Sequence, residues 1–151
     1  MNVRIDRATR GQLPLLTNFV KAFHELEEIH LTDDRREHAI GSLIDKPDLG
    51  GIWLIYDDSF AIGYIAICKG FSIEFGGYDG FLDEFYIVPE LRGKGVGATV
   101  LGLIKEEAQR MGLQALHLEV AKTNHRARKL YDSLGFVARD KYVLLSVSTN
   151  S

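Results

Sequence analysis

A glycine-rich stretch in the second half of the chain combines three glycines with two cations. It runs Val88-Pro89-Glu90-Leu91-Arg92-Gly93-Lys94-Gly95-Val96-Gly97-Ala98, between a β-type apolar run and a helical one. Glycines at alternate positions let a backbone approach a ligand and turn its amides inward. The first turn of the following helix adds unpaired N–H groups and the positive end of its dipole. With the charges of Arg92 and Lys94, this stretch is predicted to hold a diphosphate.

Other interpretations of the glycine-rich turn fit less well. The phosphate-binding pattern GxxxxGK[ST] fails, because Lys94 comes too early and no Gly-Lys-Ser/Thr follows. A dinucleotide fingerprint fits loosely as Gly93-x-Gly95-x-x-Ala98, but that motif belongs on the first strand of its fold, and too little chain follows it here. A glycine-rich connection that binds no ligand remains an alternative.

The elements that must position this turn follow from hydrophobic periodicity. Apolar residues at helical spacing predict helices over 12–28, after Thr32, over 98–111 and over 127–134, the last two ended by Gly112 and Gly135. Alternating or β-branched runs predict strands at 3–5, 52–56, 62–67, 71–75, 81–88, 116–120 and 142–147. This order predicts a mixed α/β sheet with helices packed on it, with the unit from Phe81 to Val120 parallel.

Composition narrows the class of protein. The 151 residues suit one domain, 1–151, and 18 Lys and Arg against 21 Asp and Glu give a net charge of −3, which argues against a nucleic-acid binder. The single cysteine, Cys68, excludes an internal disulfide framework. The charged start is unlike a secretory signal, and no apolar run approaches the length of a membrane helix. We therefore expect a cytoplasmic protein that binds neither nucleic acid nor membrane.

Three groups of residues together resemble the GNAT superfamily of N-acetyltransferases. Arg92-x-x-Gly95-x-Gly97 matches the Arg/Gln-x-x-Gly-x-Gly/Ala signature of that family, and residues 81–89 are similar to its fourth strand. Asn124, Ala127, Leu130-Tyr131 and Gly135-Phe136 match its distal Asn…Ala…Leu-Tyr…Gly-Phe pattern. The resemblance covers about residues 82–136. It implies a GNAT fold: a mixed, mostly antiparallel sheet of six to seven strands, about four flanking helices, and fourth and fifth strands that splay apart.

The same resemblance implies acetyl-CoA as cosubstrate and assigns residues to it. The pyrophosphate falls to the backbone from Arg92 to Ala98, that is Arg92, Gly93, Lys94, Gly95, Val96, Gly97 and Ala98. The pantetheine arm is expected along the backbone of Phe85, Tyr86, Ile87 and Val88. Asn124, Ala127 and Tyr131 are expected to contact the cofactor from the following helix.

Amine attack on a thioester needs a proton acceptor and a proton donor. A carboxylate can take the amine proton directly or through water, and Asp83 and Glu84 are the candidates. Strand alternation predicts that they point to opposite faces, with Asp83 on the face of Phe85 and Ile87. We prefer Asp83, whose position matches a carboxylate of the family. Tyr131 matches the general-acid tyrosine of the family, and a protonated phenol can donate to the leaving sulfur.

The sequence gives weaker signals for the residues that bind the acceptor amine. Acidic residues at the end of the first helix, including Glu25 and Glu28, can attract a cationic amine, as can Asp83, and Phe75 can shape the pocket. The five histidines show no metal-ligand spacing, so no metal site is predicted. Direct transfer to a primary amine of a small molecule or protein, in a ternary complex, is the predicted reaction. A non-catalytic acyl-CoA-binding or sensing module is the alternative, and the sequence leaves a homodimer open.

Overall fold

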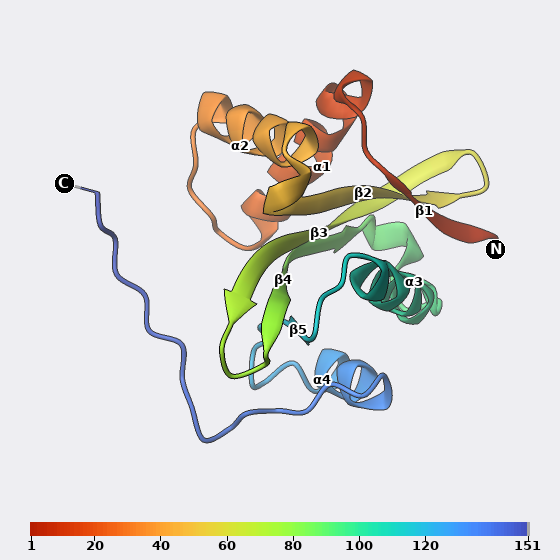
Figure 1. Cartoon of the computed structure of the whole chain (residues 1–151). Coiled ribbons are helices and arrows are strands. Elements are labelled where there is room, and N and C mark those ends of the chain that lie inside the picture. Colours follow the sequence, from red (N-terminus) through yellow and green to blue (C-terminus); the bar gives the residue numbers. More distant parts are fainter. Residues whose placement is uncertain (151) are drawn as a thin grey trace. The chain divides into compact units, whose positions relative to one another are not determined.

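The computed structural model describes residues 1–150, which divide into two compact units, 1–119 and 120–150. The first unit holds the sheet and three long helices (Figure 1). Its strands are β1 (Val3–Arg7), β2 (Gly50–Asp57), β3 (Phe60–Ser72), β4 (Gly77–Ile87) and β5 (Leu116–His117). Its helices are α1 (Leu13–Leu26), α2 (Asp33–Asp45) and α3 (Val96–Arg110), with short 3₁₀ turns at Arg10–Gln12, Pro47–Leu49 and Pro89–Leu91.

The five strands lie in the order β1-β2-β3-β4-β5, antiparallel except for the parallel pair β4–β5. The predicted mixed, mostly antiparallel sheet is thus confirmed, but six to seven strands is wrong. Two predicted strands, 62–67 and the start of 71–75, are one long strand, β3. The predicted strand at 142–147 has no ladder partner within residues 1–150, and its apolar side chains are exposed. A β-prone run forms a strand only where a neighbouring strand accepts its hydrogen bonds.

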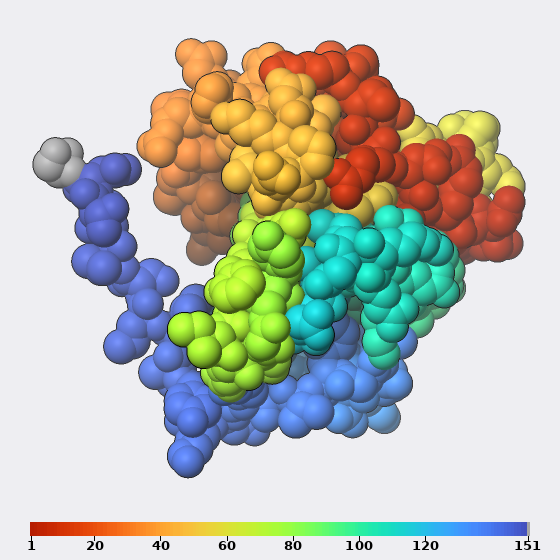
Figure 2. Space-filling model, in the orientation of Figure 1, coloured from red at the N-terminus to blue at the C-terminus, as the bar shows by residue number. Residues whose placement is uncertain are grey.

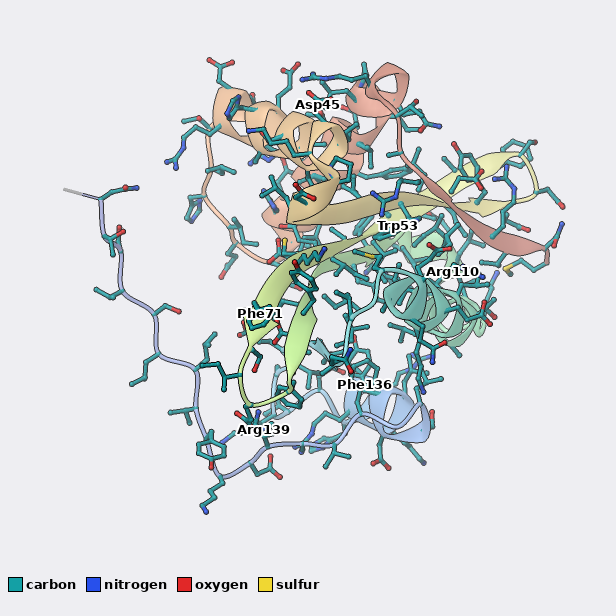
Figure 3. The ribbon with its side chains drawn as sticks, viewed as in Figure 1. Asp45, Trp53, Phe71, Arg110, Phe136 and Arg139 are labelled. Atoms are coloured by element: carbon teal, nitrogen blue, oxygen red, sulfur yellow. The ribbon has the colours of Figure 1, made fainter. Side chains whose placement is uncertain are left out.

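Helices cover both faces of the sheet in the first unit (Figure 1). On one face, α1 and α2 bury Leu16, Val20 and Ile40 against Leu54 and other residues of the sheet. On the other face lies α3, whose Val100 and Ile104 are fully buried. Trp53 of β2, labelled in Figure 3, is only 2% exposed. Burial of apolar side chains at roughly 25 cal/mol per Å² holds these layers together.

The ends of the helices agree with the sequence signals. Thr32 caps α2, with its Oγ1 accepting from the Arg35 amide at 3.2 Å. Gly112 follows α3 with φ of 76°, the left-handed conformation that glycine adopts without strain. Within residues 1–150, no helix is long and apolar enough to cross a lipid bilayer.

The second unit contains one helix, α4 (His125–Ser133). Asn124 caps it, because its Oδ1 accepts from the Ala127 amide at 3.2 Å. Gly135, at φ of 94°, ends it as predicted, and the Phe136 amide donates to the Tyr131 carbonyl at 3.0 Å. The rings of Tyr131 and Phe136 pack edge to face, with centroids 5.7 Å apart. Phe136 is labelled in Figure 3 just beyond α4.

Candidate active site

The glycine-rich turn joins the end of β4 to the start of α3. Gly93 and Gly95 have φ of 76° and 83°, and Gly95 is the residue before the helix. The left-handed conformation of two alternate residues turns successive amides in one direction, as anion-binding backbone nests require. The helix that follows has fifteen residues, long enough for a substantial dipole.

Six consecutive amides of this turn have no acceptor in the described chain. They belong to Gly93, Lys94, Gly95, Val96, Gly97 and Ala98, and neither a backbone nor a side-chain acceptor within residues 1–150 takes them. Amides left unpaired together at a helix start form a ready site for an anion. The amide of Arg92, which was predicted to belong to this group, instead donates to the Pro89 carbonyl at 3.2 Å.

Beside the turn, β4 loses its partner strand on one side. The β4–β5 ladder has only two pairs, Gly80 with Leu116 and Phe81 with His117, whereas β4 continues to Ile87. The predicted separation of these two strands is therefore present. Among the described residues, 1–150, no strand pairs with this edge of β4 along the last six residues of the strand.

Of the four residues predicted to meet the pantetheine arm, three lie in β4 and Val88 follows it, and two of the four have backbone groups on this open edge. The Val88 amide donates to Ile62 of β3 at 2.9 Å, so Val88, and Tyr86 two residues earlier, present their backbone groups to β3. The backbone N–H and C=O groups of Phe85 and Ile87 therefore point away from β3, toward the open edge. Arg92 Nε donates to the Ile87 carbonyl at 2.8 Å, and the guanidinium also lies 5.4 Å from the centre of the Tyr86 ring.

A β-bulge interrupts the pairing of β4 with β3. Ala66 pairs with Glu84 and Ile67 pairs with Leu82, so Asp83 is an extra residue in β4. A bulge of this kind re-aims side chains and locally disrupts the ladder. The strict alternation on which the prediction relied therefore does not hold at this position.

Asp83 and Glu84 consequently lie on the same side of the sheet, and the prediction of opposite faces is wrong. The charges of Asp83 and Glu84 both act on the thiol of Cys68, which lies two residues beyond Ala66 on β3 and hence on the face of Ala66 and Glu84. Burial raises the pKa of Cys68 to about 11, and the charges of Asp83 and Glu84 add to that rise.

The two carboxylates differ in their surroundings. Asp83 is exposed, whereas the side chain of Glu84 is only 19% exposed. Glu84 Oε1 accepts from the hydroxyl of Tyr64 at 2.8 Å, and Glu84 Oε2 lies 2.7 Å from Nε2 of His24. Burial, followed by the charge of Glu84, raises the pKa of Tyr64 far above its usual value. Glu84 is thus a carboxylate whose two oxygens are both oriented by the fold.

His24, Tyr64 and Arg36 were not predicted from the sequence as members of the site. Arg36 Nε donates to His24 Nδ1 at 3.1 Å, which extends the group into α2. One signal was available: His24 stands at i+4 and i+8 from Val20 and Leu16 in the buried stripe of α1. A polar side chain within an apolar helical stripe must find a buried partner.

The residues predicted for the acceptor side are dispersed. Glu25 lines a surface hollow of about 460 Å³ between α1 and α2, together with Lys21, Ile29, His30, Leu31, Thr32, Asp33 and Arg36. Glu28 follows the end of α1 with a positive φ of 57°. Phe75 lies instead beyond β3, with its ring 4.9 Å from that of His117 in β5. The end of the β3–β4 hairpin is at the surface, in yellow-green in Figure 2, and carries the exposed Phe71.

In the second unit, Tyr131 is half-buried, and burial raises the pKa of its phenol. Asn124 and Ala127 are linked through the cap of α4. Across residues 1–150, no three His, Cys, Asp or Glu side chains gather as the ligands of a metal ion would.

The turn at the start of α3 and the open edge of β4 together form a site suited to an anionic ligand. The model of the Acetyltransferase (GNAT) family matches residues 15–136, and the chain belongs to that family. It is an acetyl-CoA-dependent N-acetyltransferase.

Individual relatives agree with this assignment. An uncharacterized N-acetyltransferase of Archaeoglobus fulgidus is 29% identical over 133 residues, covering 87% of this chain and 90% of that protein. The thialysine N-epsilon-acetyltransferase of Bos taurus is 38% identical over 55 residues, which cover 36% of this chain and 32% of that protein. The crystal structure of integron cassette protein HFX_CASS3, from the mobile metagenome of Cole Harbour Salt Marsh, is 33% identical with a TM-score of 0.84, covering 97% of this chain and 91% of that one.

Proposed function

We propose that this enzyme transfers the acetyl group of acetyl-CoA to a primary aliphatic amine that is cationic in solution, by direct attack in a ternary complex. The acceptor is a small molecule or a protein side chain. The observation that carries this proposal is the turn with six unpaired amides at the end of the same strand that bears two carboxylates. The unpaired amides suit an anionic cofactor tail, and the carboxylates suit a cationic acceptor.

The cofactor assignment follows the residues of the turn. The amides of Gly93 to Ala98 hold the diphosphate, and Lys94 adds positive charge. Phe85 and Ile87 offer backbone groups to the pantetheine arm along the open edge of β4. The bound cosubstrate supplies an acetyl thioester. By family resemblance, Asn124, Ala127 and Tyr131 contact it from α4.

The acceptor must lose a proton before it attacks. An alkyl ammonium with a pKa near ~10.4 is about 3.4 units above neutral pH, so forming the free amine costs about 4–5 kcal/mol. Asp83, being exposed, pairs with the ammonium group, and Glu84 accepts the proton directly or through water. The support for this division is that both oxygens of Glu84 are oriented by partners, whereas Asp83 is accessible to solvent. A positioned base of this kind contributes roughly 10²–10⁴ in rate.

The departing thiolate requires a donor. Tyr131 is the proposed general acid, as the family resemblance implies. Because burial raises the pKa of its phenol, Tyr131 keeps its proton throughout the neutral range and has one to give to sulfur. No covalent acyl-enzyme is part of this scheme, since Cys68 is half-buried and burial raises its pKa to about 11, which makes it a poor nucleophile at neutral pH.

The acceptor class is supported by charge. Glu25 lines the hollow between α1 and α2, Glu28 follows α1, and Asp83 is exposed on β4. We assign Glu25, Glu28 and Asp83 to attraction of the cation, and Phe75 to contact with an apolar part of the acceptor. The bovine relative is named for an ε-amine of a lysine analogue, which belongs to the same class of acceptor.

A panel of amines, with release of free coenzyme A as the readout, tests this function. Lysine-type ε-amines, polyamines, α-amino acids, aminoglycosides and a lysine-containing peptide represent the candidates. We expect turnover with one or more aliphatic amines and none with neutral alcohols. Binding of acetyl-CoA without coenzyme A release for any amine would contradict the proposed transfer and would favour a sensing module.

Two variants test the separate roles of the carboxylates. We expect Glu84→Gln to lower kcat by about 10²-fold or more, and Asp83→Asn chiefly to raise KM for the amine. Asp48→Asn, an exposed residue of the 3₁₀ turn before β2, is the matched control and should retain wild-type kinetics. Full kcat in Glu84→Gln would remove Glu84 from the proposed mechanism.

A further inference from the structure

Behind Glu84 lies a chain of buried polar side chains that the reaction scheme leaves unused. It passes from Glu84 on β4 to His24 on α1 and then to Arg36 on α2, and it ends at Asp33 and the carbonyl of Leu31. The side chains of His24 and Arg36 are each only 6% exposed. The chain therefore links three elements of the fold, β4, α1 and α2, through side-chain hydrogen bonds.

The hydrogen bonds decide which nitrogen of His24 carries the proton. An arginine Nε always donates, so His24 Nδ1, at 3.1 Å from Arg36 Nε, must accept. The N–H of the ring is then on Nε2, which faces Glu84 Oε2 at 2.7 Å. His24 therefore donates to Glu84. A histidine whose one nitrogen is fixed by a second partner is held in a single tautomer and a single ring orientation.

Arg36 is itself held rigidly. Its Nη1 donates to Asp33 Oδ1 at 2.8 Å, and its Nη2 donates to the Leu31 carbonyl at 2.9 Å. All three of its guanidinium nitrogens are thus engaged, which keeps its Nε directed at His24. Asp33 also forms an ion pair with Lys21, whose Nζ lies 3.6 Å from Asp33 Oδ1.

We propose that His24 is a positioning residue for Glu84, fixing the carboxylate that receives the proton of the acceptor amine. This inference depends on the proposed role of Glu84 as base. His24 holds Oε2 by donating a hydrogen bond, Tyr64 holds Oε1 in the same way, and Arg36 sets the tautomer that makes the first bond possible. The remaining lone pairs of Glu84 are free to accept from the amine or from a bridging water.

This arrangement has a clear chemical purpose. An unrestrained glutamate samples many rotamers, and a reacting group displaced by about 1 Å can lose roughly 100-fold in rate. The β-bulge at Asp83 interrupts the ladder next to Glu84, so side-chain partners supply the rigidity that regular pairing would give. Preorganisation by surrounding hydrogen bonds is what fixed catalytic groups require.

The test compares two substitutions at the same position. His24→Leu keeps much of the volume but removes the donor, whereas His24→Gln can place an amide N–H near the position of Nε2. We expect His24→Leu to lower kcat by about 100-fold with KM for acetyl-CoA within about 2-fold of wild type, and His24→Gln to recover at least about 10-fold of that loss. His38→Gln, an exposed histidine of α2, is the control.

A spectroscopic measurement on the unmodified protein gives an answer that does not require turnover. In ¹⁵N spectra of the histidine rings we expect His24 to carry its proton on Nε2 at neutral pH. A proton on Nδ1, or a His24→Leu enzyme as active as His38→Gln, would overturn the proposal. Failure of the proposed function has a different signature: the wild-type chain would then release no coenzyme A with any amine, whatever the tautomer of His24.

Discussion

Arg92 donates its Nε–H to the carbonyl of Ile87 at 2.8 Å, and this bond joins the glycine-rich turn to the end of β4. The two residues belong to the two surfaces that the cofactor is proposed to meet, the amides of the turn and the open edge of the strand. Arg92 thus brings a permanent positive charge to their junction while it satisfies a carbonyl that has no strand partner.

Replacement of Arg92 by alanine is expected to weaken coenzyme A binding by about 10-fold, because a charge beside the diphosphate and the tie to Ile87 are both lost. Isothermal titration calorimetry measures this directly. Arg110→Ala, at the opposite end of α3 and labelled in Figure 3, is the matched control and should bind as wild type. Equal affinities for the two variants would contradict a role of Arg92 at the cofactor.

A second prediction concerns the backbone of the turn. Gly95 has φ of 83°, and a Cβ there would meet no atom within 4 Å, so alanine is disfavoured by conformation alone. We expect Gly95→Ala to lower the free energy of unfolding by about 1–2 kcal/mol. Gly102→Ala, inside α3 and equally uncrowded, should raise it by about 0.5–1 kcal/mol. Urea denaturation of both variants shows whether the signs are opposite; the same sign for both would contradict the strained turn.

The buried tyrosine of the Glu84 cluster predicts an alkaline loss of stability. Burial and the charge of Glu84 raise the pKa of Tyr64, so above pH 10.0 the unfolded chain releases this proton while the native chain retains it. The stabilisation is therefore complete below that pH and declines above it, by about 1.4 kcal/mol per pH unit. Unfolding at pH 9, 10 and 11 should show a shallower alkaline decline for Tyr64→Phe than for wild type. If the alkaline slope of Tyr64→Phe equals the slopes of wild type and of the exposed control Tyr142→Phe, the raised pKa of Tyr64 is contradicted.

The pKa of the Cys68 thiol depends on the carboxylates at the β-bulge. Its pKa of about 11 follows from burial and from the charges of Asp83 and Glu84, so little thiolate exists at neutral pH. Reaction with a disulfide reagent should rise steeply between pH 9 and pH 11, and Asp83→Asn should shift the midpoint to lower pH. A midpoint that Asp83→Asn leaves unchanged would contradict the placement of Asp83 beside Cys68, and a wild-type midpoint at the ordinary value of 9.0 would contradict the burial of the thiol.

Local signals in the sequence predicted much of the architecture. Thr32, Gly112 and Gly135 each supply a cap through their own side chain or conformational freedom, and each stands at the predicted helix end. The glycine-rich turn was likewise predicted as the link between a strand and a helix, because glycines at alternate positions favour such a connection. The prediction of a strand at 142–147 was wrong because strand formation depends on a partner strand that is distant in the sequence, and no local pattern reveals that partner.

The carboxylate site was only partly predictable. Asp83 and Glu84 were identified by type, but the bulge that brings them to one side depends on the register of β3 against β4. Likewise, the meeting of His24 with Glu84 joins residues sixty positions apart. Such long-range contacts arise from packing of α1 on the sheet. Hydrophobic periodicity predicts which face of the helix is buried, but it does not predict which two side chains meet there.

The central claim is that the amides from Gly93 to Ala98 bind the diphosphate of the cofactor. It is tested most directly by following the backbone ¹H–¹⁵N resonances of these six residues during titration with coenzyme A. We predict that all six shift together and saturate with the rest of the binding response, while the amide of Arg92, already bound to Pro89, moves less. Saturable binding of coenzyme A that leaves the six resonances in place would show that the diphosphate lies elsewhere.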